Sequence, residues 1–415
     1  MKIACVGGGP AGLYFSILMK RQDPSHDITV HERNPAGSTY GWGVTYWSEL
    51  LEKLREGDPE TAHAISQNSV SWTSGVAHVR DRTTVQPGDE GFGIGRHRLL
   101  ELLAERARSL GVRVEYESEV TADALPDADL VVAGDGVHSA VRERYADRFG
   151  SDIALGRNAY IWLGTTKVFD SFTFSFQETD HGWIWAYGYP FSGEQSTCVI
   201  ECSPRTLAGL GLDGMGEADG LARLEKIFAD ILDGHPLIGR EKGDGAAQWL
   251  TFRTLTNRTW RHGDIVLLGD AAHTTHYSIG AGTTLALEDA ICLARELGAQ
   301  PDKQAALAAY ERRRKADLLR LQSAARYSAQ WYENLPRYIH LPPEQMFALL
   351  GQRHSPLLPY VPPQLYYRLD RAAGRLEALR RLKRWLGPKL ARTSQSRALA
   401  PRKEAARQGA PHQEA

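Results

Sequence analysis

Residues 1–16 read Met-Lys-Ile-Ala-Cys-Val-Gly-Gly-Gly-Pro-Ala-Gly-Leu-Tyr-Phe-Ser, and this stretch decides the expected fold. Residues 2–6 form a short, mostly apolar run, which is typical of a buried parallel strand. Glycines at positions 7, 9 and 12 separate this run from a segment with the composition of a helix that packs on a sheet. The order of strand, glycine turn and helix predicts the first βαβ unit of a dinucleotide-binding fold.

Each glycine of this turn has its own physical task. Gly7 permits the tight change of direction, Gly9 lets the backbone approach a pyrophosphate, and Gly12 lets helix and strand pack closely. The helix start adds unpaired N–H groups that favour phosphate. Glu32 ends a second strand about 20 residues after Gly12, which is the spacing at which a carboxylate meets ribose hydroxyls. A glycine-rich turn without a ligand is the alternative, and the agreement of these elements argues against it.

Composition argues against several classes of partner. The 415 residues carry a net charge of −1 with an isoelectric point near 6.9, so no general attraction to nucleic acid or a membrane surface is expected. The four cysteines show neither a Cys-x-x-Cys pair nor zinc spacing, which predicts no metal site and a reducing, cytoplasmic location. We expect the first apolar run to be a strand and not a signal peptide, and no run approaches the roughly 20 apolar residues that span a bilayer.

Two later stretches repeat the pattern of a buried strand that ends in a polar turn. Residues 129–133 lead into Gly134-Asp135-Gly136, and residues 263–268 lead into Gly269-Asp270. The second turn continues to a glycine-rich loop at 280–283 and then to a predicted helix. Because the carboxyl ends of parallel strands lie at one edge of a sheet, we expect these turns to lie beside one ligand. An Asp-Gly turn that only caps a helix is the alternative for the first of them.

The region 160–202 has a different texture, in which aromatic side chains alternate with small, apolar or polar ones. Phe172, Phe174 and Phe176 form one such series, and residues 183–189 form a second. Alternation with a period of two predicts antiparallel strands with two different faces. Ordinary sheet packing accounts for most of these rings, but two aromatic stripes would also provide an apolar wall for a planar substrate.

In this order and at these distances, the Gly7–Gly12 turn with Glu32, the Asp135-Gly136 turn and the Gly269-Asp270 turn resemble the motifs of the class A FAD-dependent aromatic hydroxylases, a family of flavoprotein monooxygenases. The resemblance implies an α/β fold: a Rossmann-like FAD-binding domain of the glutathione-reductase type, interleaved with an antiparallel-sheet substrate domain and followed by C-terminal helices. It also implies that FAD is the cofactor, that NADH or NADPH donates the electrons and that O2 is a co-substrate.

The resemblance assigns cofactor-binding roles motif by motif. Arg96, in the pattern Arg-x-x-Leu-x-x-x-Leu, matches the arginine that these enzymes place near the flavin chain. The backbone around Val120 would face the adenine, and the loop 280–283 would face the isoalloxazine. The full expected set is Gly7, Gly9, Pro10, Ala11, Gly12, Glu32, Arg33, Trp42, Gly43, Val44, Arg96, Val120, Asp135, Gly136, Gly269, Asp270, Gly280, Ala281, Gly282 and Thr283.

Shorter sequence segments narrow the range of reactions that we expect. Residues 41–44 (Gly-Trp-Gly-Val), 157–165 and 278–284 are similar to the branch that contains salicylyl-CoA 5-hydroxylase, anthraniloyl-CoA monooxygenase and the tryptophan hydroxylase of violacein synthesis. The phrase at 178–183 resembles the aryl-CoA members more closely. The resemblance therefore implies hydroxylation of an aromatic ring through a flavin C4a-hydroperoxide. The expected substrate is an aryl-CoA thioester such as salicylyl-CoA, hydroxylated at position 5 to gentisyl-CoA.

Three alternatives stay open at this point. The enzyme could hydroxylate a free aromatic or an indole such as tryptophan, it could be a flavin reductase without oxygen insertion, or it could be a non-catalytic binding protein, because a fold does not fix chemistry. The sequence also leaves open NADH versus NADPH, the regiochemistry, the need for CoA, and whether the protein is a monomer or a homodimer.

Candidate catalytic and substrate-binding residues lie beside the flavin loop and in the aromatic strands. A base that removes a phenolic proton would assist hydroxylation, and His276 and Tyr277 are the candidates. Tyr277 also departs from the wider family, which has a proline at this position. Trp162, Trp185 and Tyr187 are the candidates for the wall of the substrate pocket.

The change in the pattern of residue types along the chain predicts its domains. The expected boundaries are 1–68, 91–158 and 259–300 for the FAD-binding domain, 69–90 and 159–258 for the substrate-binding sheet, 301–390 for a helical region and 391–415 for a basic tail. A long helix is expected over about 305–329. We expect the tail to be disordered, with its charges solvated and not bound to nucleic acid.

Overall fold

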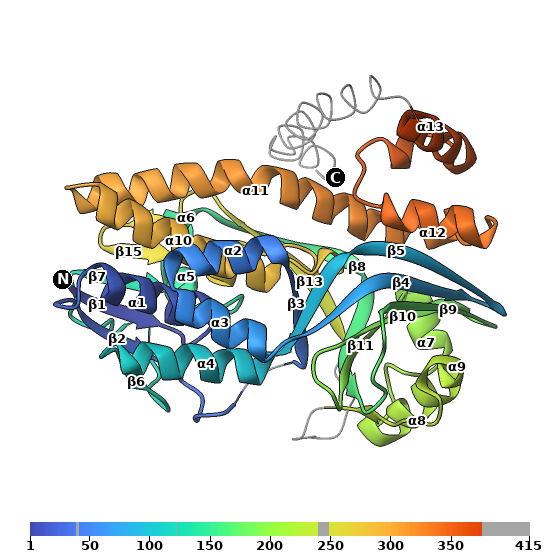
Figure 1. Ribbon diagram of the computed structural model, residues 1–415, viewed down its shortest axis with the longest axis horizontal. Coiled ribbons are helices and arrows are strands. Elements are labelled where there is room, and N and C mark those ends of the chain that lie inside the picture. The colour runs from blue at the N-terminus through green and yellow to red at the C-terminus, as the bar shows by residue number, and fades with distance from the viewer. Residues whose placement is uncertain (39–40, 122, 240–248, 376–415) are drawn as a thin grey trace, which may run out of the picture.

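Within the described residues, the chain forms two β-sheets with helices packed around them (Figure 1). The computed structural model describes residues 1–38, 41–121, 123–239 and 249–375. The expected basic tail, residues 391–415, and the end of the expected helical region, residues 376–390, lie outside the described residues.

The first sheet has six strands in the order β14–β15–β7–β1–β2–β6. Its strands are β1 (Lys2–Val6), β2 (Asp27–His31), β6 (Arg113–Glu115), β7 (Leu130–Ala133), β14 (Arg261–His262) and β15 (Ile265–Leu267). Neighbouring strands are parallel except for β14, which pairs antiparallel with β15. The turns that follow β1, β2, β7 and β15 therefore leave the sheet at one edge, as the sequence predicted.

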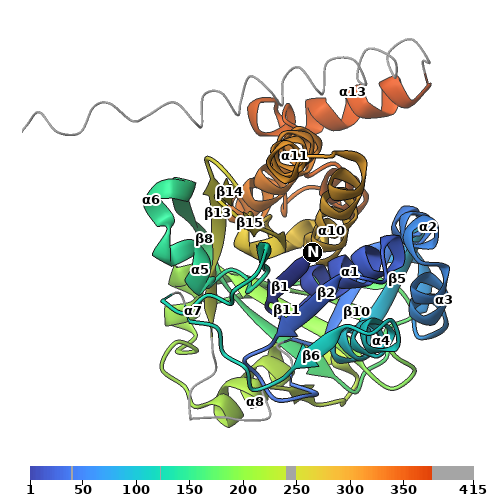
Figure 2. The same cartoon turned by 90° about the vertical axis from the view of Figure 1, so that its left-hand side faces the viewer.

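Helix α1 (Pro10–Gln22) covers this sheet and packs between α4 (Arg96–Ser109) and α10 (Gly282–Ala299). Residues 11–19 of α1 are all buried, which explains why this helix has no polar face. In Figure 2, α11, α10 and α1 follow one another downward, below α13, toward the sheet. The shorter helices of this part are α2 (Ser48–Gly57), α3 (Pro59–Gln67), α5 (Ala140–Arg144) and α6 (Ala146–Phe149).

The second sheet has nine strands: eight in the order β12–β8–β11–β10–β9–β4–β5–β3, with β13 paired to β8. Its strands are β3 (Gly43–Trp47), β4 (Val70–Val79), β5 (Arg82–Gly95), β8 (Ser151–Thr165), β9 (Phe172–Thr179), β10 (Gly182–Pro190), β11 (Ser196–Cys202), β12 (Leu237–Ile238) and β13 (Leu250–Asn257). The pairing is antiparallel except between β4 and β9, which run parallel where the sequence predicted antiparallel strands.

The strand pairing places the borders between the two sheets at other residues than the domain borders expected from the sequence. Residues 43–47 and 91–95, which the sequence placed in the FAD-binding domain, pair with each other in the nine-stranded sheet. Strand β8 begins at Ser151 and pairs with β13, so the expected border between residues 158 and 159 falls inside one strand. Local sequence predicts that a segment is a strand, but its partner is set by contacts distant along the chain.

The alternating sequence predicted strands with one face on a core and the other on something else, and in the structure both faces carry an apolar cluster. Phe174, Phe176, Trp185 and Tyr187 lie on one face and pack against the end of α11 (Lys303–Glu333) and against α12 (Pro343–Gly351). Their neighbours along the strands, such as Ile184, point to the other face. That face is covered by the helices α7 (Pro204–Gly209), α8 (Glu217–Ile227) and α9 (Ala229–Leu232).

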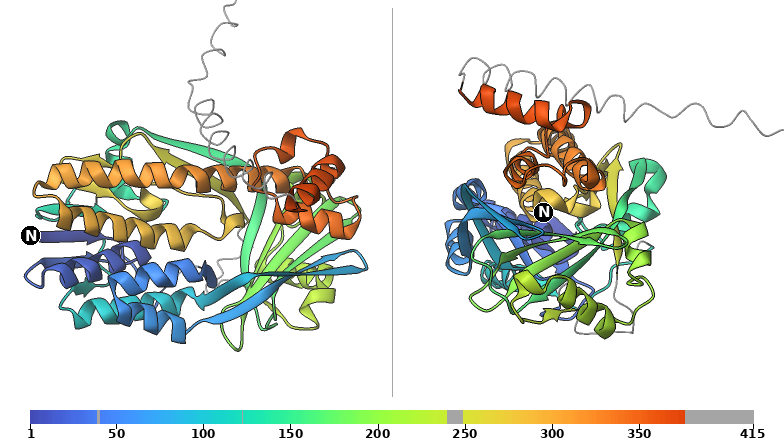
Figure 3. Two further views of the ribbon diagram at one scale, coloured as in Figure 1. Left: turned by 45° about the horizontal axis from the view of Figure 1, so that its top comes forward. Right: turned by 90° about the vertical axis from the view of Figure 1, so that its right-hand side faces the viewer.

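Helix α11 joins the two sheets (Figure 3). It packs on α10 and β14 and also contacts β8, and its last turns lie over the aromatic face. It is longer than predicted and begins where Asp302 Oδ2 accepts a hydrogen bond from the Ala305 N–H at 2.7 Å. The elements that follow are η3 (Leu335–Arg337), η4 (Leu358–Tyr360) and α13 (Pro363–Arg375).

The described part of the chain contains neither a helix long and apolar enough to cross a membrane nor a group of three side chains that could hold a metal ion. All four cysteines are free and buried. Burial raises the pKa of the thiols of Cys5, Cys198 and Cys202 to about 12, so these thiols stay protonated and unreactive.

We predict that the aromatic face contributes strongly to stability. Phe176 is fully buried beside Phe174 and Trp331, so Phe176→Ala should lower the free energy of unfolding by about 3–5 kcal/mol. Val85→Ala is the control, because Val85 is 61% exposed and its truncation should cost less than about 0.5 kcal/mol. Denaturant titrations measure both values, and equal losses would contradict the prediction.

Candidate active site

The turns after β1 and β7 are in direct backbone contact. Gly7 has a φ of +101°, and a Cβ placed on it would lie 2.5 Å from the carbonyl oxygen of Gly134. A Cβ on Gly12 would lie 2.5 Å from the carbonyl oxygen of Gly7. Only glycine fits at either position. Gly9 differs, because the nearest protein atom to its Cβ would be 3.9 Å away, which leaves room beside the backbone at the predicted pyrophosphate position.

The N-terminus of α1 has no capping side chain, and Gly9 is its N-cap residue. Pro10 occupies the first helical turn, where a missing N–H costs nothing. The remaining N–H groups and the positive end of the helix dipole can therefore act on a bound anion.

Glu32 ties the first turn to the loop after β2. Its Oε2 accepts a hydrogen bond from the Gly8 N–H at 2.8 Å, and its Oε1 accepts from the Asn34 N–H at 2.9 Å and from Asn34 Nδ2 at 2.7 Å. The carboxylate is therefore already oriented by the backbone, and it is partly exposed at the sheet edge. Arg33 beside it is exposed, and Val120 is half-buried against the core of the first sheet.

Asp135 carries an unsatisfied oxygen at the same edge. Its Oδ2 lies 3.4 Å from the Val141 N–H, while its buried Oδ1 receives no hydrogen bond from the described residues. Burial raises the pKa of Asp135 above its ordinary value, against the hydrogen bond from Ser139. Next to it, a Cβ on Gly136 would meet no atom within 4 Å. A buried acceptor beside open space indicates a position for a hydrogen-bond donor of a ligand.

Arg142 connects this turn to the turn after β15. It is buried and donates from Nη2 to the carbonyl oxygen of Val137 at 2.6 Å and from Nη1 to that of Ala271 at 3.4 Å. Ala271 belongs to the 3-10 turn η1 (Gly269–Ala271), which holds the predicted flavin residue Asp270. One guanidinium group therefore sets the spacing of two motifs that lie more than a hundred residues apart along the chain.

The charges of Asp270 and Arg96 each affect the pKa of the other residue. The Asp270 side chain is exposed, yet the surrounding protein raises its pKa by desolvation, against the charges of His273 and Arg96. Desolvation likewise lowers the pKa of Arg96, and the carboxylates of Asp270 and Glu32 oppose this shift. The structure thus brings together three of the predicted residues, one from each of three distant segments.

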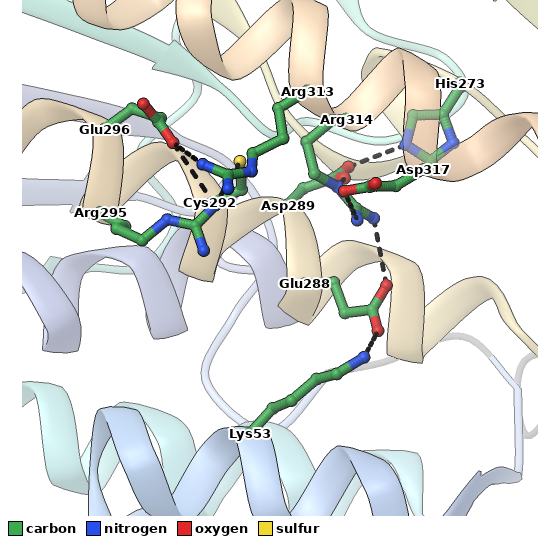
Figure 4. Close-up of polar contacts among 10 residues, drawn as sticks. All are labelled: Lys53, His273, Glu288, Asp289, Cys292, Arg295, Glu296, Arg313, Arg314 and Asp317. Atoms are coloured by element: carbon green, nitrogen blue, oxygen red, sulfur yellow. Dashed lines mark hydrogen bonds and ion pairs between the residues drawn. The ribbon is translucent and has the colours of Figure 1, made fainter.

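Asp289 of α10 supports the Gly269-Asp270 turn. Figure 4 shows its contacts with His273 and Arg314. Asp289 is fully buried and accepts hydrogen bonds from the Gly269 N–H at 3.1 Å, from His273 Nε2 at 2.8 Å and from Arg314 Nε at 2.7 Å. Burial alone would raise the pKa of Asp289, but the charges and hydrogen bonds of His273 and Arg314 hold it below its ordinary value. His273, whose ring also stacks on Trp260, is thus part of the support of the turn.

The loop before α10 approaches the same edge. Gly280 has a φ of +62°, and a Cβ on it would lie 2.6 Å from Thr45 Oγ1, so β3 and the loop are in close contact. Ala281 is the N-cap of α10 without a capping side chain, and a Cβ on Gly282 would meet no atom within 4 Å. This is a second open helix start with free space beside it, and Thr283 belongs to its first turn.

Residues 42–44 fasten this edge to the nine-stranded sheet. The Gly43 N–H donates to Thr197 Oγ1 at 2.8 Å, and the Gly43 carbonyl accepts from the Tyr189 hydroxyl at 2.9 Å. Trp42 packs over Gly164, where a Cβ would lie 2.6 Å from its ring, and Val44 is buried. These residues therefore place the sheet edge next to the aromatic strands.

The predicted aromatic wall is mostly interior. Trp185 is 2% exposed and stacks on Tyr332 of α11 with ring centroids 5.8 Å apart, and Tyr187 is buried as well. Trp162 keeps part of its surface accessible and lies over Gly41, where a Cβ would be 2.4 Å from its ring. The alternating pattern identified the face, but it could not show that α11 covers much of it.

His276 and Tyr277 lie between the flavin loop and the aromatic face. Burial, aided by the charge of Arg353, lowers the pKa of His276 to about 3, so its ring is neutral at pH 7. Tyr277 begins the turn η2 (Tyr277–Ile279), and its hydroxyl donates to Glu201 Oε2 at 2.6 Å. Glu201 was missed in the sequence, although its alternation with Val199 and Thr197 places an acidic side chain on the aromatic face.

These residues fit the chemistry of FAD. Two open helix starts and the glycines at positions 9, 136 and 282 provide backbone N–H groups and room for phosphates and a flat ring. Glu32 and Asp135 provide acceptors for hydroxyl or N–H donors. A family profile described as an FAD binding domain matches residues 1–321. The chain belongs to this FAD-binding family.

Curated relatives support the membership and narrow the class. The chain is 39% identical over 349 residues to salicyloyl-CoA 5-hydroxylase of a Streptomyces species, a match that covers 82% of this chain and 66% of that protein. It is 37% identical over 336 residues to the 3-hydroxy-4-methyl-anthranilyl-[aryl-carrier protein] 5-monooxygenase of Streptosporangium sibiricum, covering 81% of this chain and 90% of that protein. These matches confirm the resemblance to the class A flavoprotein monooxygenases, with FAD as their cofactor.

A solved structure confirms the fold. That of 2-methyl-3-hydroxypyridine-5-carboxylic acid oxygenase superposes with a TM-score of 0.64, covering 81% of this chain and 92% of that chain at 20% identity. The predicted α/β architecture with a second sheet and C-terminal helices is therefore that of this family of FAD-binding proteins.

We predict that Asp289 stabilises the fold through its buried charge. Asp289→Asn removes the charge that Arg314 faces, and since Arg314 is 5% exposed, the free energy of unfolding should fall by about 3–5 kcal/mol. Asp317 also contacts Arg314, at 3.7 Å, but is 59% exposed, so Asp317→Asn should cost less than about 1 kcal/mol.

The free energy of unfolding should also depend on pH differently in the wild type and in Asp289→Asn. Because the pKa of Asp289 is lowered in the fold, its stabilisation is complete above the unfolded pKa near 3.9 and is lost as the pH falls through the folded pKa. Denaturant titrations between about pH 3 and pH 7 should show a smaller acid loss in Asp289→Asn than in the wild type. Identical acid losses would contradict the assignment.

Proposed function

We propose that this protein is an FAD-dependent, NAD(P)H-consuming monooxygenase that hydroxylates an aromatic ring carried as a thioester, with salicylyl-CoA, hydroxylated at position 5 to gentisyl-CoA, as the first candidate substrate. The observation that carries the proposal is the convergence of the turns after β1, β2, β7 and β15 beside an aromatic sheet. The names of both relatives describe an aromatic acyl group on a carrier, CoA in one and a carrier protein in the other.

The proposal assigns each part of the cofactor to a described segment. Gly9 and the start of α1 hold the pyrophosphate, and Glu32 accepts the ribose hydroxyls. Asp270 and Arg96 hold the ribityl chain, because their charges act on each other at the sheet edge beside Glu32. Residues 280–283 at the start of α10 receive the flavin ring.

Bound FAD, once reduced by NAD(P)H, supplies activated oxygen to the substrate ring. The residues of this chain orient the ring and keep water away from it. Trp162 offers a partly accessible aromatic surface next to Gly41. Tyr187 and Tyr277 of the same aromatic cluster stack with ring centroids 6.3 Å apart. His276 is neutral and serves as a hydrogen-bond partner rather than as a base. The four buried free thiols support a reducing, cytoplasmic location.

The decisive experiment follows the oxidation of NADH and of NADPH by the FAD-loaded protein with salicylyl-CoA, anthraniloyl-CoA, free salicylate and tryptophan. We expect one nucleotide oxidised for each product molecule that is one oxygen atom heavier, with kcat/KM highest for a CoA thioester. Oxidation without a gain in mass would indicate a flavin reductase. Turnover of free salicylate or tryptophan alone would contradict the thioester assignment.

The role assigned to Asp270 predicts a specific loss of cofactor. Asp270→Ala should weaken FAD binding by about 10- to 150-fold, the equivalent of one charge-assisted hydrogen bond worth roughly 1.5–3 kcal/mol. Because Asp270 is exposed and receives no hydrogen bond from a described residue, the free energy of unfolding of the apoprotein should hardly change.

The matched control is Asp264→Ala. Asp264 lies just before β15, which leads into the Gly269-Asp270 turn, and it pairs with Lys303 at 2.7 Å on the surface. Quenching of FAD fluorescence measures the dissociation constants, and denaturant titration measures stability. An Asp270→Ala protein that loses stability and FAD affinity together would mean that the residue is structural.

A further inference from the structure

A carboxylate lies buried in the middle of the aromatic face. Glu201 of β11 is 1% exposed, and its strand neighbours in register are Tyr160 of β8 and Trp185 of β10. The other side chains of β8, β10 and β11 in this cluster are Val199 and aromatic rings. An unpaired charge is costly in such surroundings, so its presence calls for a physical reason.

Two hydrogen bonds orient this carboxylate. Asn158 Nδ2 donates to Oε1 at 2.7 Å, and the Tyr277 hydroxyl donates to Oε2 at 2.6 Å. Tyr277 comes from the turn that immediately precedes the loop at 280–283, whereas Glu201 and Asn158 come from the nine-stranded sheet. The pair therefore joins the predicted flavin loop to the substrate sheet.

Tyr277 is the more accessible member of the pair. Its ring is partly accessible and is flanked by the rings of Tyr160 at 4.3 Å and Tyr187 at 6.3 Å between centroids. Its hydroxyl oxygen, which donates its proton to Glu201, keeps lone pairs that can accept a hydrogen bond. A substrate hydroxyl within hydrogen-bond distance of this oxygen could thus donate its proton to it.

Burial tunes the protonation of both groups. Desolvation raises the pKa of Glu201 to about 7, against the hydrogen bonds from Tyr277 and Asn158. Desolvation also raises the pKa of Tyr277 well above its ordinary value, so its hydroxyl is neutral at pH 7. The titratable and charged groups that face the pair are Tyr160, Tyr187, Cys202, His276, Tyr332, Glu333 and, behind His276 and Tyr332, Arg353.

We propose that Tyr277 and Glu201 form a proton relay that draws the hydroxyl proton from a phenolic substrate while its ring is being hydroxylated. The proposal rests on the proposed function, because it needs a hydroxylated ring beside the loop 280–283. Tyr277 touches the substrate, and Glu201 acts through Tyr277.

The relay moves one proton and no electrons. The O–H bond of the substrate breaks as a new O–H bond forms at Tyr277 Oη. The original proton of Tyr277 moves along the 2.6 Å hydrogen bond to Glu201 Oε2. The phenol becomes more electron-rich as it loses its proton, and the carboxylate becomes a neutral acid that suits its apolar surroundings. Between turnovers the proton returns along the same hydrogen bond, and Tyr277, which is partly accessible, releases a proton to water.

His276 cannot take this role. Its pKa of about 3 means that its ring does not hold a proton near neutral pH, and its Nδ1 is engaged with Ser278 Oγ at 2.8 Å. A base with a pKa near the working pH transfers protons most effectively, and Glu201 meets this condition.

The first test is the pH profile of kcat/KM with the preferred phenolic substrate. Since the carboxylate is the active form, the wild-type rate should rise as the pH increases through about 7 and then level off. Glu201→Gln keeps the shape and can accept the Tyr277 hydrogen bond but cannot take the proton, so kcat should fall by about 10²–10⁴-fold with little change in KM and the rise near pH 7 should vanish. Tyr277→Phe should give a similar loss, and the double variant no further loss.

Two neighbouring substitutions should move the profile in opposite directions without removing the relay. Asn158→Ala deletes a hydrogen bond that lowers the pKa of Glu201, so the rise should shift to higher pH. Glu333→Gln deletes a like charge that raises this pKa, so the rise should shift to lower pH. A residue with a purely structural role would produce no such opposed shifts, and these variants keep the proposal testable if Glu201→Gln fails to fold.

A readout independent of turnover separates this inference from the proposed function. Difference infrared titration of the wild type against Glu201→Gln, without substrate, should show a protonated carboxyl band that disappears as the pH rises through about 7. Absence of that band would overturn the relay. Hydroxylation with identical pH profiles in the wild type and Glu201→Gln would overturn the relay alone, whereas failure of every aromatic substrate would overturn the proposed function.

Discussion

The close contact between the turn after β1 and the turn after β7 is the constraint on which the rest of the structure depends. A Cβ at Gly7 would lie 2.5 Å from the Gly134 carbonyl oxygen, so the two turns can meet only because glycine stands at position 7. The contact fixes how far α1 lies from the sheet edge and leaves its first N–H groups open. The other motifs converge on the same place because parallel strands have their carboxyl ends at one edge of the sheet.

The buried charge of Asp289 beneath that edge keeps the Gly269-Asp270 turn in place. Asp289 accepts hydrogen bonds from a backbone N–H, a histidine and an arginine, so its full desolvation is compensated on every side. Arg142 bridges the carbonyl oxygens of two turns in the same way. Such networks orient a turn more strictly than apolar packing does, because each partner has a preferred direction. The exposed Asp270 can then present its carboxylate from a rigid base.

The nine-stranded sheet holds the carboxylate of Glu201 within an apolar face, where it meets the hydroxyl of Tyr277. Helix α11 covers part of the aromatic face, where Tyr332 stacks on Trp185, and the ring of Tyr277 lies beside Tyr187 between sheet and loop. Glu201 is tolerated there because two donors reach it from different elements. The same burial that makes the carboxylate costly brings its pKa to about 7. The cost in stability and the chemical usefulness of this residue thus have one cause.

The sequence by itself determined the first sheet, the turns at its edge and the membership of an FAD-binding family, because each motif is short and its physical requirement is local: a glycine where no Cβ fits, or an acid where a strand ends. It also determined that the middle strands have two faces. Only the tertiary structure decided that β3 and the end of β5 join the nine-stranded sheet, that α11 buries Trp185, and that Glu201 meets Tyr277. These outcomes depend on contacts between residues far apart in the chain, about which the local alternation of apolar and polar residues carries no information.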